Sequence, residues 1–148
     1  MILLDTNLLG RITDAADPQF PPARKAIHSL LAERERLIVA PQNLYEFWAV
    51  ATRRPGPPPT GQNGLGMVPE QASQWLRFFM RRFTVLPDRE DLLARWHDLV
   101  KTLGITGLRS HDARLVAVMQ SYGITRLLTF NADHFAIFPI TVIDPASL

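Results

Sequence analysis

The chain opens with Met1-Ile2-Leu3-Leu4-Asp5-Thr6-Asn7-Leu8-Leu9, and this stretch decides the fold. Ile2 to Leu4 form an apolar run without polar alternation, which is typical of a strand buried on both faces of a parallel sheet. Open α/β sheets bind ligands outside the carboxyl ends of their strands, and Asp5 directly follows such an end. Asp5 is therefore either a turn residue or a candidate ligand, and the rest of the chain must distinguish these roles.

The composition is that of one folded domain, which we expect to span residues 1–148. Of the 148 residues, 47% are hydrophobic and 20% are charged, a balance that excludes a disordered chain. The absence of cysteine excludes disulfides and thiolate metal sites. We find no apolar run of roughly 18 residues or more that would predict a membrane span, and no secretory signal. These features favour a cytoplasmic protein without a membrane partner.

Strand-like and helix-like segments alternate along the chain. We expect strands at 2–4, 37–39, 84–86, 126–128 and 140–143, and helices at 23–36, 41–52, 69–82, about 88–103 and 111–122. Asp88 and Ser110 are the expected N-caps of the last two helices, and the helix at 41–52 is apolar enough to be largely buried. This order predicts an α/β fold with a mostly parallel central sheet of about five strands, covered by helices on both sides.

Residues 55–66 form the only low-complexity segment, with the sequence Pro-Gly-Pro-Pro-Pro-Thr-Gly-Gln-Asn-Gly-Leu-Gly. So many prolines and glycines cannot continue a helix or a strand. We therefore expect a long exposed loop within the single domain. Its role stays open, and a flap over a substrate cleft is one candidate.

Two acidic residues are isolated within apolar segments. Glu46 is the only acid between positions 36 and 69, and Asp112 is the only one between positions 99 and 132. A lone carboxylate is costly to bury unless an arginine, a set of backbone N–H groups or a metal ion meets it. Each of these two acids therefore needs a partner of one of these kinds.

Each acid also has an ordinary structural explanation. Glu46 could pair with Arg53 on its own helix, and Asp112 could stabilise the N-terminus of its helix through the helix dipole. Asp133 could cap a turn or a short helix. Together with Asp5, however, all of them fall just past a strand's end or in the helix start beyond it, and in a parallel sheet these positions lie on one side and can converge.

Carboxylates that share a pocket repel one another, and the ordinary way to hold them ionised is one or two Mg²⁺ or Mn²⁺ ions. A site of this kind polarises a phosphodiester, activates a water molecule and stabilises the leaving oxygen. Phosphodiester hydrolysis is the chemistry that this pattern predicts.

The same stretches resemble the PIN-domain ribonucleases, most closely the VapC-type toxins of prokaryotic toxin–antitoxin pairs. The matching stretches are the opening strand with Asp5-Thr6-Asn7, residues 41–48 around Glu46, residues 110–117 around Asp112, and residues 127–135. This resemblance implies a three-layer α/β/α domain, one or two Mg²⁺ or Mn²⁺ ions, and endonucleolytic cleavage of RNA. It also implies a small antitoxin as partner and, commonly, a homodimer.

The resemblance assigns roles to particular side chains. Asp5, Glu46 and Asp112 match the acidic positions that hold the metal. Supporting positions are matched by Thr6, Asn7 and Thr129.

The fourth acidic position departs from the family pattern. Asn131 stands where the family carries Asp or Asn, and His134 stands where an Asp often precedes the phenylalanine. Either Asn131 coordinates through its amide oxygen or through a water molecule, or Asp133 completes the site, and one or two metal ions remain possible. His134 and His111 are more typical of structural histidines than of ligands.

The leading hypothesis is a metal-dependent ribonuclease toxin in which Arg114 steers the RNA backbone. One alternative is a catalytically weakened PIN-fold binding domain, with Asn131 as the trace of a lost site. Another is a haloacid-dehalogenase-like phosphatase, although such an enzyme needs a second Asp where this chain has Asn7. The aromatic residues between positions 75 and 79 belong to the core, an antitoxin groove or a dimer face.

Overall fold

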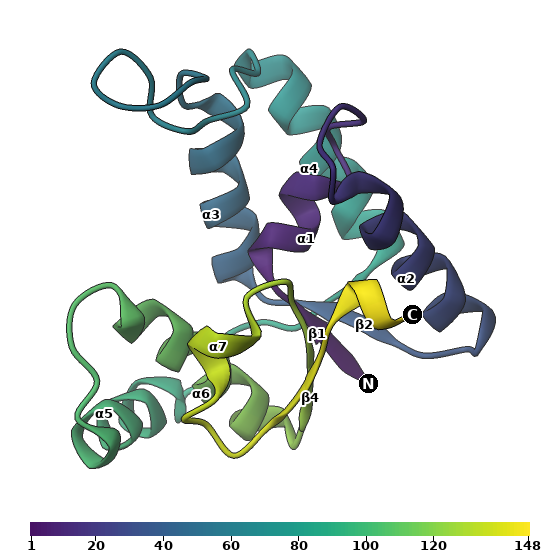
Figure 1. Cartoon of the computed structure of the whole chain (residues 1–148). Coiled ribbons are helices and arrows are strands. Elements are labelled where there is room, and N and C mark those ends of the chain that lie inside the picture. The colour runs from purple at the N-terminus through teal and green to yellow at the C-terminus, as the bar shows by residue number, and fades with distance from the viewer.

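A five-stranded, fully parallel sheet lies at the centre of the computed structural model, which describes all residues 1–148 (Figure 1). The strand order across the sheet is β3-β2-β1-β4-β5, and helices cover both of its faces. This confirms the predicted three-layer α/β/α fold. The strands are β1 (Ile2–Leu4), β2 (Leu37–Val39), β3 (Thr84–Val85), β4 (Arg126–Leu128) and β5 (Thr141–Ile143).

The central strand β1 is completely buried, as its unbroken apolar run predicts. Leu3 is in register with Ile38 of β2 and with Leu127 of β4. Because side chains alternate along a strand, Ile2 and Leu4 enter one hydrophobic core while Leu3 enters the other. The sheet therefore separates two cores, and β1 contributes to both.

Each face of the sheet carries its own set of helices. On one face the core of 17 buried residues is covered by α1 (Thr6–Arg11), α2 (Phe20–Ala32), α3 (Pro41–Thr52) and α4 (Pro69–Arg82). On the other face the core of 15 buried residues is covered by α5 (Leu92–Leu103), α6 (Arg109–Tyr122) and the short α7 (Ala132–Phe135). A 3₁₀ turn, η1 (Pro145–Ser147), follows β5. None of the helices combines the length and apolarity needed to cross a membrane.

Several predicted helix boundaries were wrong. α2 begins at Phe20, because two prolines fit its first turn, and it ends at Ala32, since Arg34 adopts a positive φ of 60°. Asp88 is not an N-cap, because α5 begins after Asp91. Ser110 is not one either, because it lies inside α6, which begins at Arg109.

Two short helices, α1 and α7, occupy stretches where no helix was predicted. With six and four residues they are too short to show a helical repeat of apolar side chains. Each follows a strand closely: α1 follows β1 after Asp5, and α7 follows β4 after residues 129–131. They therefore direct the chain away from the sheet immediately beside the predicted site.

The helix α3 is less buried than predicted. Leu44, Phe47 and Ala51 pack into the core, but Tyr45 is 71% exposed and Trp48 is 37% exposed. The loop that follows folds back along the end of this helix, where the Leu65 N–H donates to the Val50 carbonyl at 3.0 Å. As predicted, residues 55–66 are almost entirely exposed, with Gly61 as the buried exception.

Candidate active site

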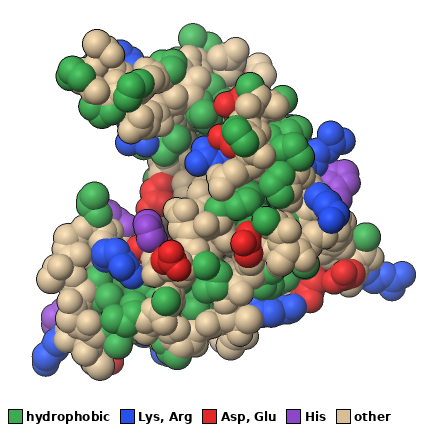
Figure 2. Space-filling view, viewed as in Figure 1, with side chains coloured by type: hydrophobic (Ala, Val, Ile, Leu, Met, Phe, Trp, Pro, Cys, Tyr) green, Lys and Arg blue, Asp and Glu red, His purple; other side chains and the backbone are tan.

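The strand order places a crevice at one particular edge of the sheet. The chain runs from β1 outward to β2 and β3, and then returns to place β4 on the opposite side of β1. Open α/β sheets bind ligands at such a switch point, outside the carboxyl ends of the strands. A pocket of about 460 Å³ lies there, and its polar lining includes Asp5, Glu46, Asp112, Asn131 and His134. In Figure 2 the molecule is hollowed on its left side, between the two helical layers, and acidic side chains lie in and beside this hollow.

Asp5 leaves β1 directly into this pocket. Its backbone N–H still pairs with the Leu128 carbonyl of β4 at 3.0 Å, so the sheet holds its position. Its Oδ2 atom accepts hydrogen bonds from the Thr129 hydroxyl at 2.6 Å and from the Asn7 amide at 2.9 Å. Burial raises the pKa of the Asp5 carboxyl to about 6, against the hydrogen bond from Thr129, and the charges of Glu46 and Asp112 raise it further.

The buried hydroxyl of Thr129 joins the ends of the two central strands. It accepts hydrogen bonds from the Asn7 side-chain amide and from the Asn131 backbone N–H, both at 3.0 Å, and donates its only proton to Asp5. A hydroxyl offers one donor and two acceptor positions, so all three are used. This fixes the direction of the proton and makes Thr129 an orienting group for Asp5, in agreement with its predicted supporting role.

Glu46 reaches the same pocket from the second turn of α3. Its Oε2 atom accepts from the Thr6 hydroxyl at 2.6 Å, and its Oε1 atom accepts from the Gln42 amide at 2.7 Å. Neither donor carries a charge, and the alternative ion pair with Arg53 is not formed. The helix α3 therefore presents to the pocket a carboxylate whose charge is not neutralised by any basic side chain.

Asp112 lies in the first turn of α6 on the opposite side of the pocket. It is half-buried and faces two basic groups, Arg109 Nε at 3.4 Å and His134 Nδ1 at 3.8 Å. Burial raises the pKa of the Asp112 carboxyl, while the charges of His134 and Arg109 oppose this shift. Helix-dipole stabilisation, the structural alternative for this residue, coexists with its position in the pocket.

The residues proposed for the fourth position are placed differently from one another. Asn131 and His134 line the pocket, whereas Asp133 is exposed in the first turn of α7 and is absent from the lining. Arg114 is engaged elsewhere, because its guanidinium donates to Gln42 at 2.8 Å and to Asp88 at 2.5 Å.

Two residues at the base of α3 support the site and were missed from the sequence. Buried Asn43 donates to the Thr6 hydroxyl at 3.2 Å, and Gln42 supports Glu46. The spacing of Gln42 and Glu46, four positions apart on a predicted helix, is the signal that could have revealed their contact. The contact of Asn43 with Thr6 links α3 to α1, and nothing in the local sequence indicates it.

The chemistry of the pocket fits a hard divalent cation. No three carboxylate or histidine side chains are arranged closely enough in this structure to enclose an ion. Acceptor oxygens are nevertheless in surplus, since Asp5 and Glu46 meet only neutral donors and the buried Asn7 Oδ1 has no partner at all. Carboxylate and amide oxygens are the ligands that Mg²⁺ and Mn²⁺ prefer, and an added cation would relieve this surplus.

Comparison with known proteins agrees with this architecture. A family model described as PIN domain matches residues 2–139. A search of curated protein sequences gave no match.

Similar solved structures include DNA-bound VapBC from Salmonella typhimurium, with a TM-score of 0.68 at 18% identity over 98% of this chain and 99% of that chain. A toxin–antitoxin complex from Klebsiella pneumoniae gives a TM-score of 0.66 at 19% identity over 98% of both chains. The Mycobacterium tuberculosis toxin VapC20, described as cleaving the sarcin–ricin loop, gives 0.62 at 20% identity over 95% of this chain and 98% of that chain. At these identities the likeness shows a shared fold.

Proposed function

The chain belongs to the PIN domain family, and from this premise we propose that it is a Mg²⁺- or Mn²⁺-dependent endoribonuclease and the toxin of a toxin–antitoxin pair. The observation that carries the proposal is the pocket at the β1–β4 switch point. There Asp5, Glu46 and Asp112 line the same pocket, and the first two have no basic partner. The family match also favours this function over the haloacid-dehalogenase-like phosphatase.

In this proposal Asp5, Glu46 and Asp112 hold the cation, with Asn131 or Asp133 as the fourth ligand. A bound cation supplies an activated water and offsets charge on the scissile phosphate. The chain's own contribution is orientation, because Thr129 and Asn7 direct the Asp5 carboxylate while Thr6 directs that of Glu46. Preorganised ligands of this kind need little rearrangement during the reaction.

We assign contact with the RNA backbone to Arg53 in preference to Arg114. Arg53 is exposed at the end of α3 and lines the pocket, and its guanidinium has no hydrogen-bonding partner. Arg11 also lines the pocket, but it is engaged with Gln19 at 2.7 Å and with Asp17 at 3.0 Å. A free guanidinium at the rim is suited to a phosphate of an RNA substrate.

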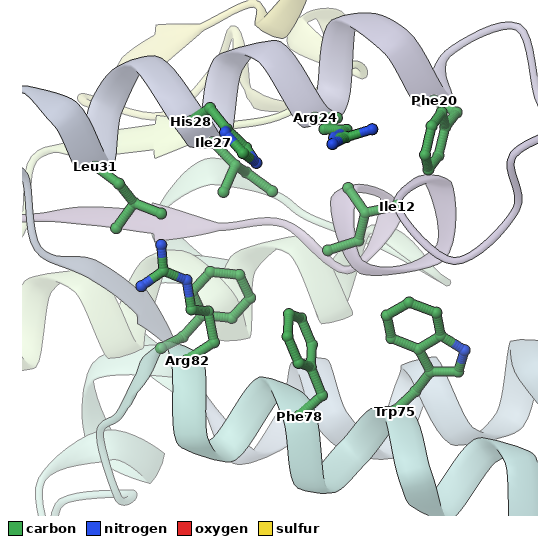
Figure 3. Close-up of a pocket in the computed structure, with 10 residues that line it drawn as sticks. Ile12, Phe20, Arg24, Ile27, His28, Leu31, Trp75, Phe78 and Arg82 are labelled. Atoms are coloured by element: carbon green, nitrogen blue, oxygen red, sulfur yellow. The ribbon is translucent and has the colours of Figure 1, made fainter.

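The proposed antitoxin would bind in the groove between α2 and α4 (Figure 3). Ile27 of α2 and Trp75 and Phe78 of α4 point toward one another across an apolar pocket. Arg24 and Arg82 add two basic groups to its lining. This combination suits an apolar segment that also carries acidic side chains. One structurally similar protein, from Klebsiella pneumoniae, is a toxin–antitoxin complex, which supports a small cognate antitoxin as partner. The proposal further places the protein in the cytoplasm, with the toxin itself as a homodimer.

The variant Asp5→Asn tests the nuclease proposal. We expect the wild-type protein to cleave a fluorescent RNA with Mg²⁺ or Mn²⁺ and to lose this activity in excess EDTA. Asp5→Asn should fold and fail to cleave, whereas the control Asp98→Asn on the exposed side of α5 should cleave normally. Undiminished cleavage by Asp5→Asn would disprove the assignment. The absence of Mn²⁺ binding to the wild-type protein in calorimetry would instead favour the catalytically weakened binding domain.

A further inference from the structure

A continuous series of hydrogen bonds leads from the protein surface to the Glu46 carboxylate. Asp88 accepts from Arg114 Nη2 at 2.5 Å, and Arg114 Nη1 donates to Gln42 Oε1 at 2.8 Å. Gln42 Nε2 then donates to Glu46 Oε1 at 2.7 Å. Gln42, the middle of the series, is 7% exposed, so water has little access to its amide, whereas the outer bond between Arg114 and Asp88 is exposed.

Arg114, the Glu46 carboxylate and the His111 carbonyl all select the same orientation of the Gln42 amide. A guanidinium has donors only, so the atom of Gln42 that faces it must be the amide oxygen. The amide nitrogen is thereby turned toward Glu46, where a carboxylate can only accept. The opposite orientation would place the amide oxygen against the carboxylate, which would repel it, and Arg114 holds the amide in the favoured orientation.

Gln42 also links the two helices that carry the acids on opposite sides of the pocket. Its Nε2 atom makes a second hydrogen bond, to the backbone carbonyl of His111 at 3.0 Å. His111 immediately precedes Asp112 on α6, whereas Glu46 is on α3. The Gln42 side-chain amide is the donor or the acceptor in every hydrogen bond between α3 and α6.

The series positions Glu46 without neutralising it. The charge of Arg114 is met by Asp88, in an ion pair at 2.5 Å, and the group that touches Glu46 is a neutral amide. A neutral donor leaves the carboxylate its full charge for a cation, which a direct arginine contact would not do.

We propose that Gln42 and Arg114 are positioning residues that fix the orientation of Glu46 and its separation from Asp112, and thereby set the affinity of the pocket for a divalent cation. The proposal rests on the proposed function, because it concerns the same acidic site. It assigns Arg114 a role inside the protein in place of contact with RNA.

The variants Gln42→Met and Arg114→Lys test this proposal. Met keeps the length of the side chain without its polar atoms, and Lys keeps the charge of Arg114 but cannot bridge Gln42 and Asp88 as a planar fork. We expect each variant to bind Mn²⁺ roughly 10- to 100-fold more weakly in calorimetry, the usual effect of losing a group that orients a metal ligand. The KM for RNA should change less than about twofold while kcat falls, since an orienting role does not affect phosphate contact.

The double variant and a matched control sharpen the test. Because both residues act through one amide, the double variant should bind Mn²⁺ no more weakly than the weaker single variant. Arg95→Lys, at the exposed ion pair with Asp91 on α5, should leave Mn²⁺ affinity unchanged. Circular dichroism establishes that each protein is folded. If Gln42→Met fails to fold, Arg114→Lys still tests the positioning role, because Arg114 is half-exposed.

The outcomes separate this proposal from the proposed function. Mn²⁺ affinity that is unchanged in Arg114→Lys, or a raised KM with unchanged Mn²⁺ affinity, would overturn the positioning role and return Arg114 to the RNA surface. If Glu46→Gln weakens Mn²⁺ binding while Gln42→Met and Arg114→Lys do not, the positioning role would likewise be overturned, and the nuclease proposal would stand. A wild-type protein that binds no Mn²⁺ would overturn both.

Discussion

The Asp5 carboxylate is held where its own charge is unfavourable. Burial and two neighbouring carboxylates raise its pKa to about 6, although the Thr129 hydroxyl donates to it at 2.6 Å. In the metal-free protein this carboxyl therefore opposes folding whenever it is ionised. Asp5 contributes to the pocket at a cost to the stability of the fold.

The variant Asp5→Asn should therefore stabilise the metal-free protein. A carboxyl whose pKa is higher in the folded state than its ordinary 3.8 destabilises the fold above the higher value and ceases to do so below the lower one. At about pH 8 in EDTA, Asp5→Asn should raise the free energy of unfolding by up to about 3 kcal/mol. Urea unfolding should show this difference disappear as the pH falls from about 6 to about 4. A difference independent of pH would contradict it.

Arg53 should contribute to RNA binding and not to the chemical step. Because its guanidinium is free at the pocket rim, Arg53→Ala should raise the KM for RNA, leave kcat nearly unchanged and weaken the dependence of KM on salt, by about one unit of the logarithmic slope. The adjacent Arg54 is exposed but does not line the pocket, so Arg54→Ala is the matched control. Equal effects of the two substitutions would argue for general surface charge.

Among the secondary-structure elements, the apolar strands and the long helices could be predicted from the sequence, and the two shortest helices could not. The strand β1 could be predicted because its run is apolar without alternation, and α4 because its pattern extends over 14 residues. α1 and α7 could not be predicted. Ser110 and Asp88 were misassigned as caps, because α6 and α5 begin at Arg109 and Leu92 and neither helix has a side-chain capping hydrogen bond.

Part of the candidate site could also be predicted from the sequence, and part of it could not. Asp5 and Glu46 could be placed together from the sequence, because they follow β1 and β2 and parallel strands bring their ends to one side of the sheet. Asp112 follows the helix α5 and lies in the first turn of α6, and the family resemblance placed it with the other two. Gln42 and Arg114 could not be paired, since their contact joins positions 72 residues apart. The fourth position remains a prediction, with Asn131 inside the pocket and Asp133 outside its lining.

The junction of α3 and α4 depends on one aromatic contact. Phe79 is fully buried and meets Phe47 edge-to-face, with ring centroids 4.9 Å apart. Phe79→Ala should lower the free energy of unfolding by about 3–5 kcal/mol, through lost burial and the cavity that remains. Its neighbour Phe78 is 43% exposed, so Phe78→Ala should cost much less in the same urea titration. Similar losses would show that the junction does not depend on Phe79.

At the scale of the whole molecule, the pocket and the groove share one helical layer. α1 contributes Thr6 and Asn7 to the pocket, and Ile12, directly after α1, lines the groove between α2 and α4. A protein bound in the groove would therefore contact the chain one residue beyond the helix that supports the acids. This arrangement gives an antitoxin a route to the nuclease site that need not cover the site itself.

A substitution in the groove should separate partner binding from catalysis. Phe78→Glu should weaken binding of the proposed antitoxin by at least about tenfold, since it places an acid in an apolar contact, and RNA cleavage should persist. Met80, 49% exposed on the same helix but absent from the groove, provides the control Met80→Glu. Calorimetric titration with the purified antitoxin checks both. Unchanged affinity of Phe78→Glu would place the antitoxin elsewhere.

The loop of residues 55–66 extends beyond the end of α3, and with Asn63 and Leu65 it forms one wall of the pocket. Its backbone is held locally, since the N–H groups of Gln62 and Gly64 both donate to the Arg54 carbonyl at 3.0 Å. The loop takes no part in the sheet that places the acids. Evolution can therefore lengthen, shorten or rewrite this wall while the catalytic groups stay in place. Divergence among PIN domains that act on different substrates should accordingly concentrate in this segment.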